Sequence, residues 1–347
     1  MADKRAGSSS SGHPPPYAVA VTGPGSDNSD SITESWGDPG WMESATTWLD
    51  DRLHTAGLKR TGDVTQPYLR PWATVLSAPT SAGRVWLKAM APGTTFEVGL
   101  YELLVRLAPH NVLTPIASDP GRGWILLPDG GASLGDRLKG TELLEHMLIA
   151  LPQYARLQRS TTAHVESLLD LGLSDLRPGV LPARFDESIE VRGDDDISPR
   201  LASIQPSFVD WCRRLSESPI APGLDHNDLH PWNILGIGTG VPASASTTTA
   251  IFYDWGDSVV AHPFGSALGS LSRVRRMLRL DRDHRDVRRM SDAYLEVFDD
   301  LTSRHDLYET LEIACRVAKA ARAVVWDRSE ESIREYLGQA SRDDFGI

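Results

Sequence analysis

The stretch that most constrains the fold of this chain runs from His226 to Asn233 and reads His-Asn-Asp-Leu-His-Pro-Trp-Asn. About twenty residues later an apolar run ends in Tyr-Asp-Trp, with the aspartate at Asp254. A carboxylate at Asp228, an amide at Asn233 and a second carboxylate at Asp254 therefore follow one another in a fixed order. The fold has to bring a loop and a later strand to one place for these three side chains to act together.

Oxygen donors of this kind indicate a particular chemistry. Carboxylate and amide oxygens are the ligands that Mg²⁺ prefers, and phosphoryl transfer from a nucleotide needs such ligands beside a residue that orients the attacking hydroxyl. Asp228 suits the orienting role, and Asn233 and Asp254 suit the metal. Lys88 lies in the otherwise apolar run 85–89. A charge there would face a desolvation cost without an anionic partner, so we expect one.

The residues before position 128 predict a sheet. Alternating and β-branched runs predict strands, and apolar residues at helical spacing predict helices. We expect a helix over 43–57, strands over 66–69, 72–77 and 85–89, a helix from an N-cap at Thr94 to about Ala108, and strands over 112–116 and 123–127. This gives a five-stranded antiparallel sheet with one helix inserted after the third strand.

The pattern becomes helical after the turn signal Pro128-Asp129-Gly130-Gly131. We expect helices over 143–157, 165–171, 206–215 and much of 267–338, an acidic surface loop over 186–196, and a hairpin of strands 233–237 and 250–253 joined by the flexible loop 238–249. The fold class predicted is α+β: a bilobed, protein-kinase-like fold with a mainly helical second lobe and an embedded β-hairpin. The segments are 1–38, disordered or loosely ordered; 39–128, the nucleotide-binding lobe; and 129–347, the catalytic and substrate-binding lobe.

The two motifs resemble those of the aminoglycoside phosphotransferase/choline kinase-like family of small-molecule kinases. The family pattern is His-Gly-Asp-Leu-His-Pro-x-Asn followed by an apolar strand ending in Ile-Asp-Trp, and the resemblance covers roughly residues 45–330. It implies ATP and Mg²⁺ as cofactors and transfer of the γ-phosphoryl group to a hydroxyl of a small molecule. It leaves open whether that molecule is an antibiotic, an amino alcohol, a sugar or a related metabolite.

The resemblance also implies residue roles. Asp228 takes the role of catalytic base, and Asn233 and Asp254 those of cofactor-binding magnesium ligands. His226 resembles a residue that holds the loop by hydrogen bonding. Lys88 resembles the lysine that contacts the α- and β-phosphates of ATP.

That lysine needs a carboxylate from the following helix. Glu97 and Glu102 are five residues apart, so they lie about 140° apart around the helix and only one can face the sheet. The spacing to the apolar residues around it favours Glu97. Leu127 lies in the region 126–130, which resembles the hinge whose backbone binds adenine.

Three positions depart from the family pattern. Asn227 replaces glycine, and asparagine is the least costly substitute if the position needs a positive φ. His262 and Ser266 stand where antibiotic-modifying members carry aspartates. These two differences put aminoglycoside specificity in doubt.

Composition limits the partners. A net charge of −12 argues against nucleic acid, which favours a basic surface, and is compatible with a cationic small substrate. No apolar run approaches the length of about 18 residues that a membrane span requires, and the N-terminus lacks a secretory signal pattern. The two cysteines, Cys212 and Cys315, match no metal or redox spacing, which favours a reducing cytoplasm.

Three alternatives stand beside this interpretation. The chain could be a catalytically silent, regulatory pseudokinase; His226, Asp228 and His230 could form the metal cluster of a hydrolase; and Trp232 and Trp255 could belong to an aromatic cage for a quaternary ammonium. The sequence argues against other kinase classes. The P-loop motif and the glycine-rich loop, Asp-Phe-Gly and Ala-Pro-Glu elements of protein kinases are absent from the sequence. The turn 77–83 is then expected to cover the phosphates without a glycine pattern.

Overall fold

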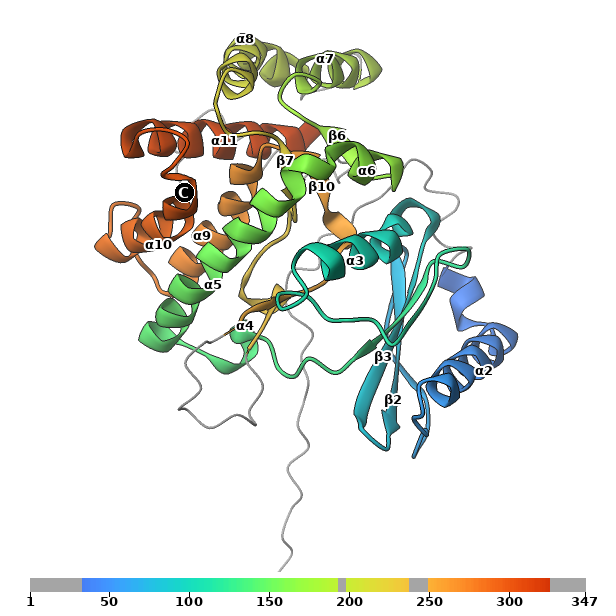
Figure 1. The fold of residues 1–347 in the computed structure, drawn as a ribbon. Helices are drawn as coiled ribbons and strands as arrows, with labels where there is room; N and C mark the ends of the chain where they lie inside the picture. Colours follow the sequence, from blue (N-terminus) through green and yellow to red (C-terminus); the bar gives the residue numbers. More distant parts are fainter. Residues whose placement is uncertain (1–32, 193–197, 237–248, 325–347) are drawn as a thin grey trace, which may run out of the picture.

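A five-stranded antiparallel sheet forms the first part of the protein (Figure 1). The computed structural model describes residues 33–192, 198–236 and 249–324. The strand order is β1-β2-β3-β5-β4. The strands are β1 (Thr65–Arg70), β2 (Ala73–Thr80), β3 (Gly83–Met90), β4 (Ala117–Asp119) and β5 (Trp124–Pro128). The predicted fold class, with its antiparallel sheet and inserted helix, is confirmed.

Helix α2 (Pro39–Thr55) covers one face of this sheet. Its N-cap, Asp38, accepts a hydrogen bond from the backbone N–H of Trp41, so the helix begins four residues before the predicted start. Successive residues of a strand point to opposite faces, and Val85, Leu87 and Ala89 pack toward α2. Alternation therefore turns Lys88 to the other face, toward the second part of the molecule.

Helix α3 (Phe96–Leu107) lies on that other face. Its first residue follows a short 3₁₀ turn, Pro92–Thr94, so the expected N-cap at Thr94 is wrong. The Thr94 hydroxyl instead donates to backbone carbonyls of Trp72 and Ala91, which joins the start of the helix to the β1–β2 turn.

Two further expectations in this part are wrong in position. The fourth strand lies at 117–119, because Val112 forms a bridge with Phe252 and packs in the core between the two parts. The turn at 81–83 joins β2 to β3 at the end of the hairpin remote from Lys88. The β1–β2 turn, where Arg70 pairs with Ala73, is the one at the end near Lys88.

The second part is mainly helical, as expected. Its principal helices are α5 (Gly140–Thr161), α6 (Val165–Asp170), α7 (Leu181–Arg192), α8 (Ser198–Ser216), α9 (Ser266–Met277), α10 (Arg285–Leu295) and α11 (Arg304–Val324), with a short α4 (Leu134–Arg137) after the turn at Gly131. The expected loop over 186–196 is wrong for its first half, because α7 continues to Arg192. Phe185 on α7 stacks on Phe208 of α8 at 4.4 Å, which gives that helix a core contact the acidic composition hides.

Two small sheets interrupt the helices. The predicted hairpin is confirmed as β8 (Ile234–Leu235) and β9 (Ile251–Phe252), which are antiparallel. A three-stranded sheet with the order β6-β10-β7 was not predicted. Its strands are β6 (Ser174–Leu176), β7 (Gly223–Asp225) and β10 (Val259–Ala261).

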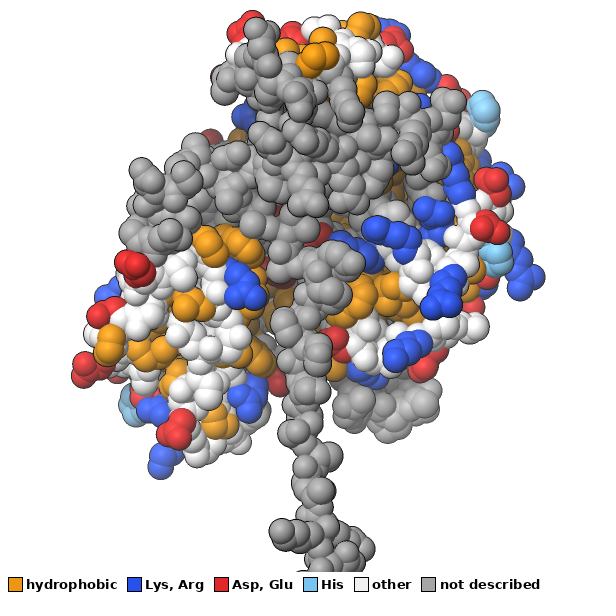
Figure 2. Space-filling view, turned by 180° about the vertical axis from the view of Figure 1, so that it is seen from behind, with side chains coloured by type: hydrophobic (Ala, Val, Ile, Leu, Met, Phe, Trp, Pro, Cys, Tyr) orange, Lys and Arg blue, Asp and Glu red, His pale blue; other side chains and the backbone are white. Residues whose placement is uncertain are grey.

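Several expectations fall on residues 1–32, 193–197, 237–248 and 325–347, which lie outside the described residues. They concern the N-terminal segment, the end of the acidic stretch, the loop between β8 and β9, and the last helical residues. Within the part that is described, no helix has the length and apolarity needed to cross a membrane. The view from behind in Figure 2 shows Lys and Arg side chains gathered on the helical part.

Candidate active site

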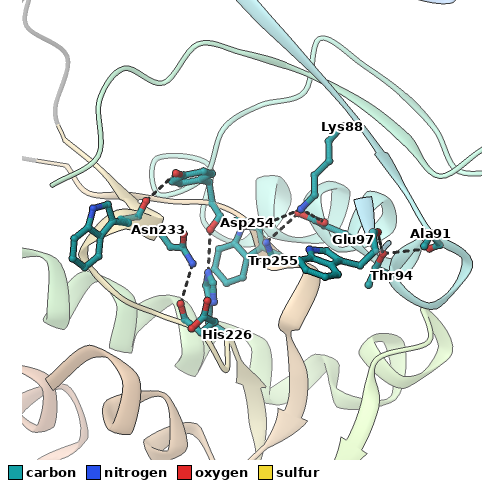
Figure 3. Close-up of polar contacts among 12 residues, drawn as sticks. Lys88, Ala91, Thr94, Glu97, His226, Asn233, Asp254 and Trp255 are labelled. Carbon is teal, nitrogen blue, oxygen red and sulfur yellow. Dashed lines mark hydrogen bonds and ion pairs between the residues drawn. The ribbon is translucent and has the colours of Figure 1, made fainter. Parts of the chain in front are cut away.

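Lys88 lies between two carboxylates where the sheet meets the second part (Figure 3). Its Nζ is 2.6 Å from Oε2 of Glu97 and 2.6 Å from Oδ1 of Asp254. The lysine comes from β3, Glu97 from the first turn of α3, and Asp254 from the end of the β8–β9 hairpin. Three segments far apart in the sequence thus converge on one ammonium group.

The three charges depend on one another. Burial alone would lower the pKa of Lys88, but the two adjacent carboxylates raise it well above its ordinary value. Burial raises the pKa of Glu97, whose side chain is 0% exposed. Burial also opposes the charge of Asp254, yet the Lys88 ammonium brings the pKa of that carboxyl below its ordinary value. Asp254 is thus ionised at neutral pH, with half of its side chain open to solvent.

The choice between the two glutamates of α3 is settled by their contacts. Glu97 pairs with Lys88 through Oε2 and accepts a hydrogen bond of 3.0 Å at Oε1 from the backbone N–H of Trp255. Glu102 instead accepts a hydrogen bond of 2.9 Å from the hydroxyl of Ser118 on the exposed side. Glu97 therefore joins the sheet to the residue that follows Asp254.

The backbone at Asp254 is left-handed, with φ of 63°. Aspartate is among the few residues other than glycine that adopt this region at moderate cost. The turn takes the chain out of β9 and into the 3₁₀ turn Trp255–Asp257. It presents the carboxylate to Lys88 while the Trp255 ring enters the core, where it is 0% exposed.

His226 holds the motif loop, residues 226–233, to the hairpin. Its Nε2 lies 3.0 Å from the carbonyl oxygen of Tyr253, and since a carbonyl only accepts, Nε2 carries the proton. The imidazole packs against the Trp255 ring at 4.7 Å. Burial lowers the pKa of His226, although the nearby carboxylates of Asp228 and Asp254 raise it. A buried neutral histidine of this kind positions the loop, as expected.

Asn227 also has a left-handed backbone, with φ of 64°. The position does require a positive φ, so the replacement of glycine by asparagine is explained. Its N–H donates to Oδ1 of Asp225 at 2.7 Å. Its side-chain oxygen accepts a hydrogen bond of 2.7 Å from Nε of Arg322, and its carbonyl accepts a second from Nη2. Asp225, Asn227 and Arg322 are all buried.

Polar side chains on one face of α5 contact the same loop. Tyr154, Gln158 and Thr161 recur at helical spacing and are buried. The Tyr154 hydroxyl accepts from the N–H of His226, and it lies 2.6 Å from the Ser266 hydroxyl, which donates to Asp225. Burial raises the pKa of Asp225, against the effects of Arg322 and these hydrogen bonds. Ser266 thus belongs to a buried network in which the carboxylate is Asp225.

Asp228 itself faces outward from this support. Its side chain is 39% exposed; Oδ2 is 3.3 Å from Nε2 of His230, and Oδ1 is 3.9 Å from Nη2 of Arg273. Helix α9 reaches the loop at Gly269, where an added Cβ would lie 3.0 Å from the carbonyl oxygen of Leu229. The absence of a side chain there lets Arg273, one turn later, approach Asp228.

Asn233 is turned so that its amide nitrogen faces the loop. Nδ2 of Asn233 donates a hydrogen bond of 3.0 Å to the carbonyl oxygen of Asp228. The side-chain oxygen of Asn233 takes no part in this hydrogen bond. An amide oxygen and the ionised carboxylate of Asp254 are hard donors of the kind that suit Mg²⁺. The donor set therefore fits this ion. Leu127 lies apart from these contacts, paired with Trp86 in the sheet and 7% exposed.

Two alternatives from the sequence are not supported by the geometry. Trp255 is fully buried, and one face of the Trp232 ring is covered by Gly135 of α4, so the two rings do not form a cage. Among the described residues, the one cluster of metal-ligating side chains is the exposed group of His305, Asp306 and Glu309. The triplet at 226, 228 and 230 does not form one.

Sequence reasoning missed the residues that hold the loop from outside the motif. Arg322 and Arg273 come from α11 and α9, and nothing in their local sequence points to position 227 or 228. For Asp225 the sequence does contain a signal: this carboxylate directly precedes the motif, so it is expected to be buried together with the motif. Tyr68 on β1 was also missed; burial and the charge of Asp254 raise its pKa.

The chain was compared with known proteins. No protein-family model matches it, and no curated protein sequence does. Solved structures match over most of its length. A choline/ethanolamine kinase family protein from Mesorhizobium loti superposes with a TM-score of 0.55 at 12% identity, covering 82% of this chain and 90% of that one. The choline kinase LicA from Streptococcus pneumoniae gives 0.54 at 12%, covering 86% and 97%.

A third match is the GDP and kanamycin complex of APH(2″)-IIIa, with a TM-score of 0.51 at 14% identity, covering 80% of this chain and 91% of that one. The chain has the fold of these small-molecule kinases. Because the sequence identities are this low, the structural matches show a shared fold. Within this fold, the motif loop, the hairpin and Lys88 meet where the sheet contacts the helical part.

Proposed function

We propose that the protein is an ATP- and Mg²⁺-dependent phosphotransferase that moves the γ-phosphoryl group to a hydroxyl of a small molecule. One observation carries the proposal: Lys88, Glu97 and Asp254 converge within 2.6 Å ion pairs, and His226 joins this cluster to the loop that bears Asp228. A structural ion pair alone would not need a buried glutamate, an ionised aspartate in left-handed backbone and an exposed carboxylate beside them.

Each residue then has a task. Lys88, fixed by Glu97, binds the α- and β-phosphates of ATP. Asn233 and Asp254 hold Mg²⁺, which when bound neutralises charge on the phosphates. Asp228 orients the acceptor hydroxyl and accepts its proton. The hydroxyl oxygen forms the new bond to the γ-phosphorus, the bond from that phosphorus to the β–γ bridging oxygen breaks, and ADP leaves with the electron pair.

The segment around Leu127 is the proposed adenine contact. This segment continues β5 toward the turn at Asp129-Gly130-Gly131. Its backbone therefore lies at the proposed boundary between the two lobes, residues 39–128 and 129–347. The preference for ATP follows from the resemblance of the motifs, while three of the matched structures are GDP complexes. Competition between the two nucleotides for the purified protein distinguishes them.

Calorimetric titration with ATP, with and without Mg²⁺, tests the proposal. We expect Mg²⁺ to strengthen ATP binding, and Asp254→Asn to remove that dependence while the fold is kept, because asparagine also tolerates left-handed backbone. ATP binding that ignores the metal in the unaltered protein, together with no phosphoryl transfer to any hydroxylated compound, would instead identify a regulatory pseudokinase.

A further inference from the structure

Helix α9 brings a basic face to the edge of the site. Its backbone touches the motif loop at Gly269, next to the carbonyl of Leu229. Arg273 and Arg276 follow four and seven residues later, so they lie on the same face of the helix as Gly269. At about 1.5 Å of rise per residue, both guanidinium groups belong to the surface that extends from Asp228 along α9.

Arg273 is directed at the catalytic loop. Its Nη2 is 3.9 Å from Oδ1 of Asp228, and its side chain is 23% exposed. Arg276 is exposed, and its Nε donates to the carbonyl of Ser272 at 3.4 Å. The positive charges of Arg273 and Arg276 therefore start beside Asp228, the carboxylate proposed to orient the acceptor hydroxyl, and extend outward along α9.

The charge of this segment opposes that of the whole chain. Residues 273–289 contain eight arginines against three aspartates, a formal surplus of five positive charges in a protein of net charge −12. In α10 the arginines Arg285 and Arg289 have carboxylate partners, as does Arg282 before it. Within the described ranges, no carboxylate lies at ion-pair distance from Arg275, Arg276 or Arg279.

The C-terminal end of a helix favours cations because of its dipole, and this accounts in part for Arg275 and Arg276 in the last turn of α9. It does not account for Arg273, which precedes that turn and is turned toward Asp228. A guanidinium at this position repels a cationic acceptor and attracts an anionic one. The arginines thus make the acceptor side of the site basic, although the chain as a whole is acidic.

We propose that the phosphoryl acceptor is a small hydroxylated anion. Its carboxylate or phosphate group is bound by Arg273 and Arg276, and its hydroxyl lies at Asp228. The proposal rests on the proposed function, because it names the class of molecule to which the γ-phosphoryl group is transferred. It names an acceptor of the opposite charge to the cationic small substrate with which the net charge of −12 is compatible.

The test uses three-carbon acceptors that share a scaffold and differ in charge: glycerate and glycerol 3-phosphate as anions, glycerol as the neutral compound, and 2-amino-1,3-propanediol as the cation. A charge-balanced set of larger hydroxylated metabolites accompanies them. Two quantities are measured on the full chain with Mg²⁺: ADP release from ATP, and binding of each compound by calorimetry in the presence of a non-hydrolysable ATP analogue.

The variants are Arg273→Gln, Arg273→Lys and the control Arg285→Gln. Arg285 has a side chain that is 86% exposed and contacts its neighbour Asp286, so the control makes the same charge change away from the site. We expect the anions to be preferred. Loss of one charged hydrogen-bonding group should raise the KM or Kd of the best anion about ten- to a hundredfold in Arg273→Gln, with the KM for ATP unchanged. Arg273→Lys should be intermediate, because it keeps the charge and loses the planar fork.

A preferred acceptor that is neutral or cationic overturns the proposal, and so does the absence of any anion binding that depends on Arg273. The outcomes also separate the two proposals. Transfer to a cation leaves the phosphotransferase standing and removes the anionic acceptor. Anion binding through Arg273 without any ATP turnover does the reverse. A preference for glycerate over glycerol 3-phosphate, or the opposite, distinguishes the carboxylate from the phosphate as the group bound.

Discussion

Arg322, near the end of α11, donates a hydrogen bond of 2.7 Å to the side-chain oxygen of Asn227, the residue before Asp228. A second hydrogen bond from the same guanidinium reaches the Asn227 backbone carbonyl. Both side chains are buried. The left-handed turn that presents Asp228 is therefore fixed by a helix almost a hundred residues away in the sequence, and its stability should depend on that contact.

Replacing Arg322 by methionine tests this dependence. The variant keeps the volume of the stem but leaves two acceptors of Asn227 unpaired and the carboxylate of Asp225 without its nearby cation. We expect a loss of about 3–5 kcal/mol in the free energy of unfolding, the range for breaking a buried ionic contact. Urea unfolding followed by circular dichroism measures it.

Arg316→Met is the matched control on the same helix. Arg316 is partly exposed and pairs with Glu312 one turn away, so its loss should cost less than about 1 kcal/mol. Equal losses in the two variants would show that the contact with Asn227 has no special weight.

Lys88→Met should remove nucleotide binding and also destabilise the fold. Glu97 is fully buried, and without the ammonium its charge is uncompensated, so the pKa of that carboxyl should rise further. The double variant Lys88→Met with Glu97→Gln removes the charge and should recover thermal stability without recovering ATP binding. Thermal unfolding and ATP titration on the three proteins separate the two effects. A double variant that is no more stable than Lys88→Met contradicts the account.

Much of the fold and of the site could be predicted, for a physical reason. Alternation in β3 fixes which face carries Lys88, and helical spacing in α3 places Glu97 and Glu102 on different faces. The motif loop and the strand to Asp254 are local in sequence. For Asn227 the sequence offers a conditional expectation, because asparagine is the least costly substitute for glycine if the position needs a positive φ.

What could not be predicted comes from tertiary contacts. The acidic stretch after Phe185 reads as a loop, and it is helical because Phe185 stacks on Phe208. Val112 reads as a strand residue, but it packs between the two parts. Arg273 and Arg322 look like ordinary surface arginines of helices, since only the packing of α9 and α11 on the motif loop brings them to it.

His262 makes stability depend on pH. It is buried, its Nδ1 accepts a hydrogen bond from the N–H of Phe264, and burial lowers its pKa from 6.5 to about 3. The unfolded chain therefore binds a proton that the folded chain does not, between about pH 6.5 and pH 3, and stability falls as the pH falls through this window. The contribution from pH 7 to pH 5 is about 2 kcal/mol.

His262→Asn isolates this effect, because the asparagine oxygen can replace Nδ1 as acceptor without titrating. Unfolding free energies of both proteins at pH 7 and pH 5 give the comparison. We expect the original protein to lose about 2 kcal/mol more than the variant over this interval. Parallel losses would place the acid sensitivity elsewhere, for example at His226, whose pKa burial also lowers.

The most direct measurement for the central claim is transfer of the γ-phosphoryl group of ATP by the protein and by its Asp228→Asn variant. Labelled ATP, Mg²⁺ and a panel of hydroxylated small molecules are used, and ATP affinity is measured in parallel. We predict transfer to at least one compound, and a rate lower by about 10²–10⁴ in the variant with ATP affinity unchanged, as for loss of a general base. A variant that transfers phosphate at the original rate would contradict the account.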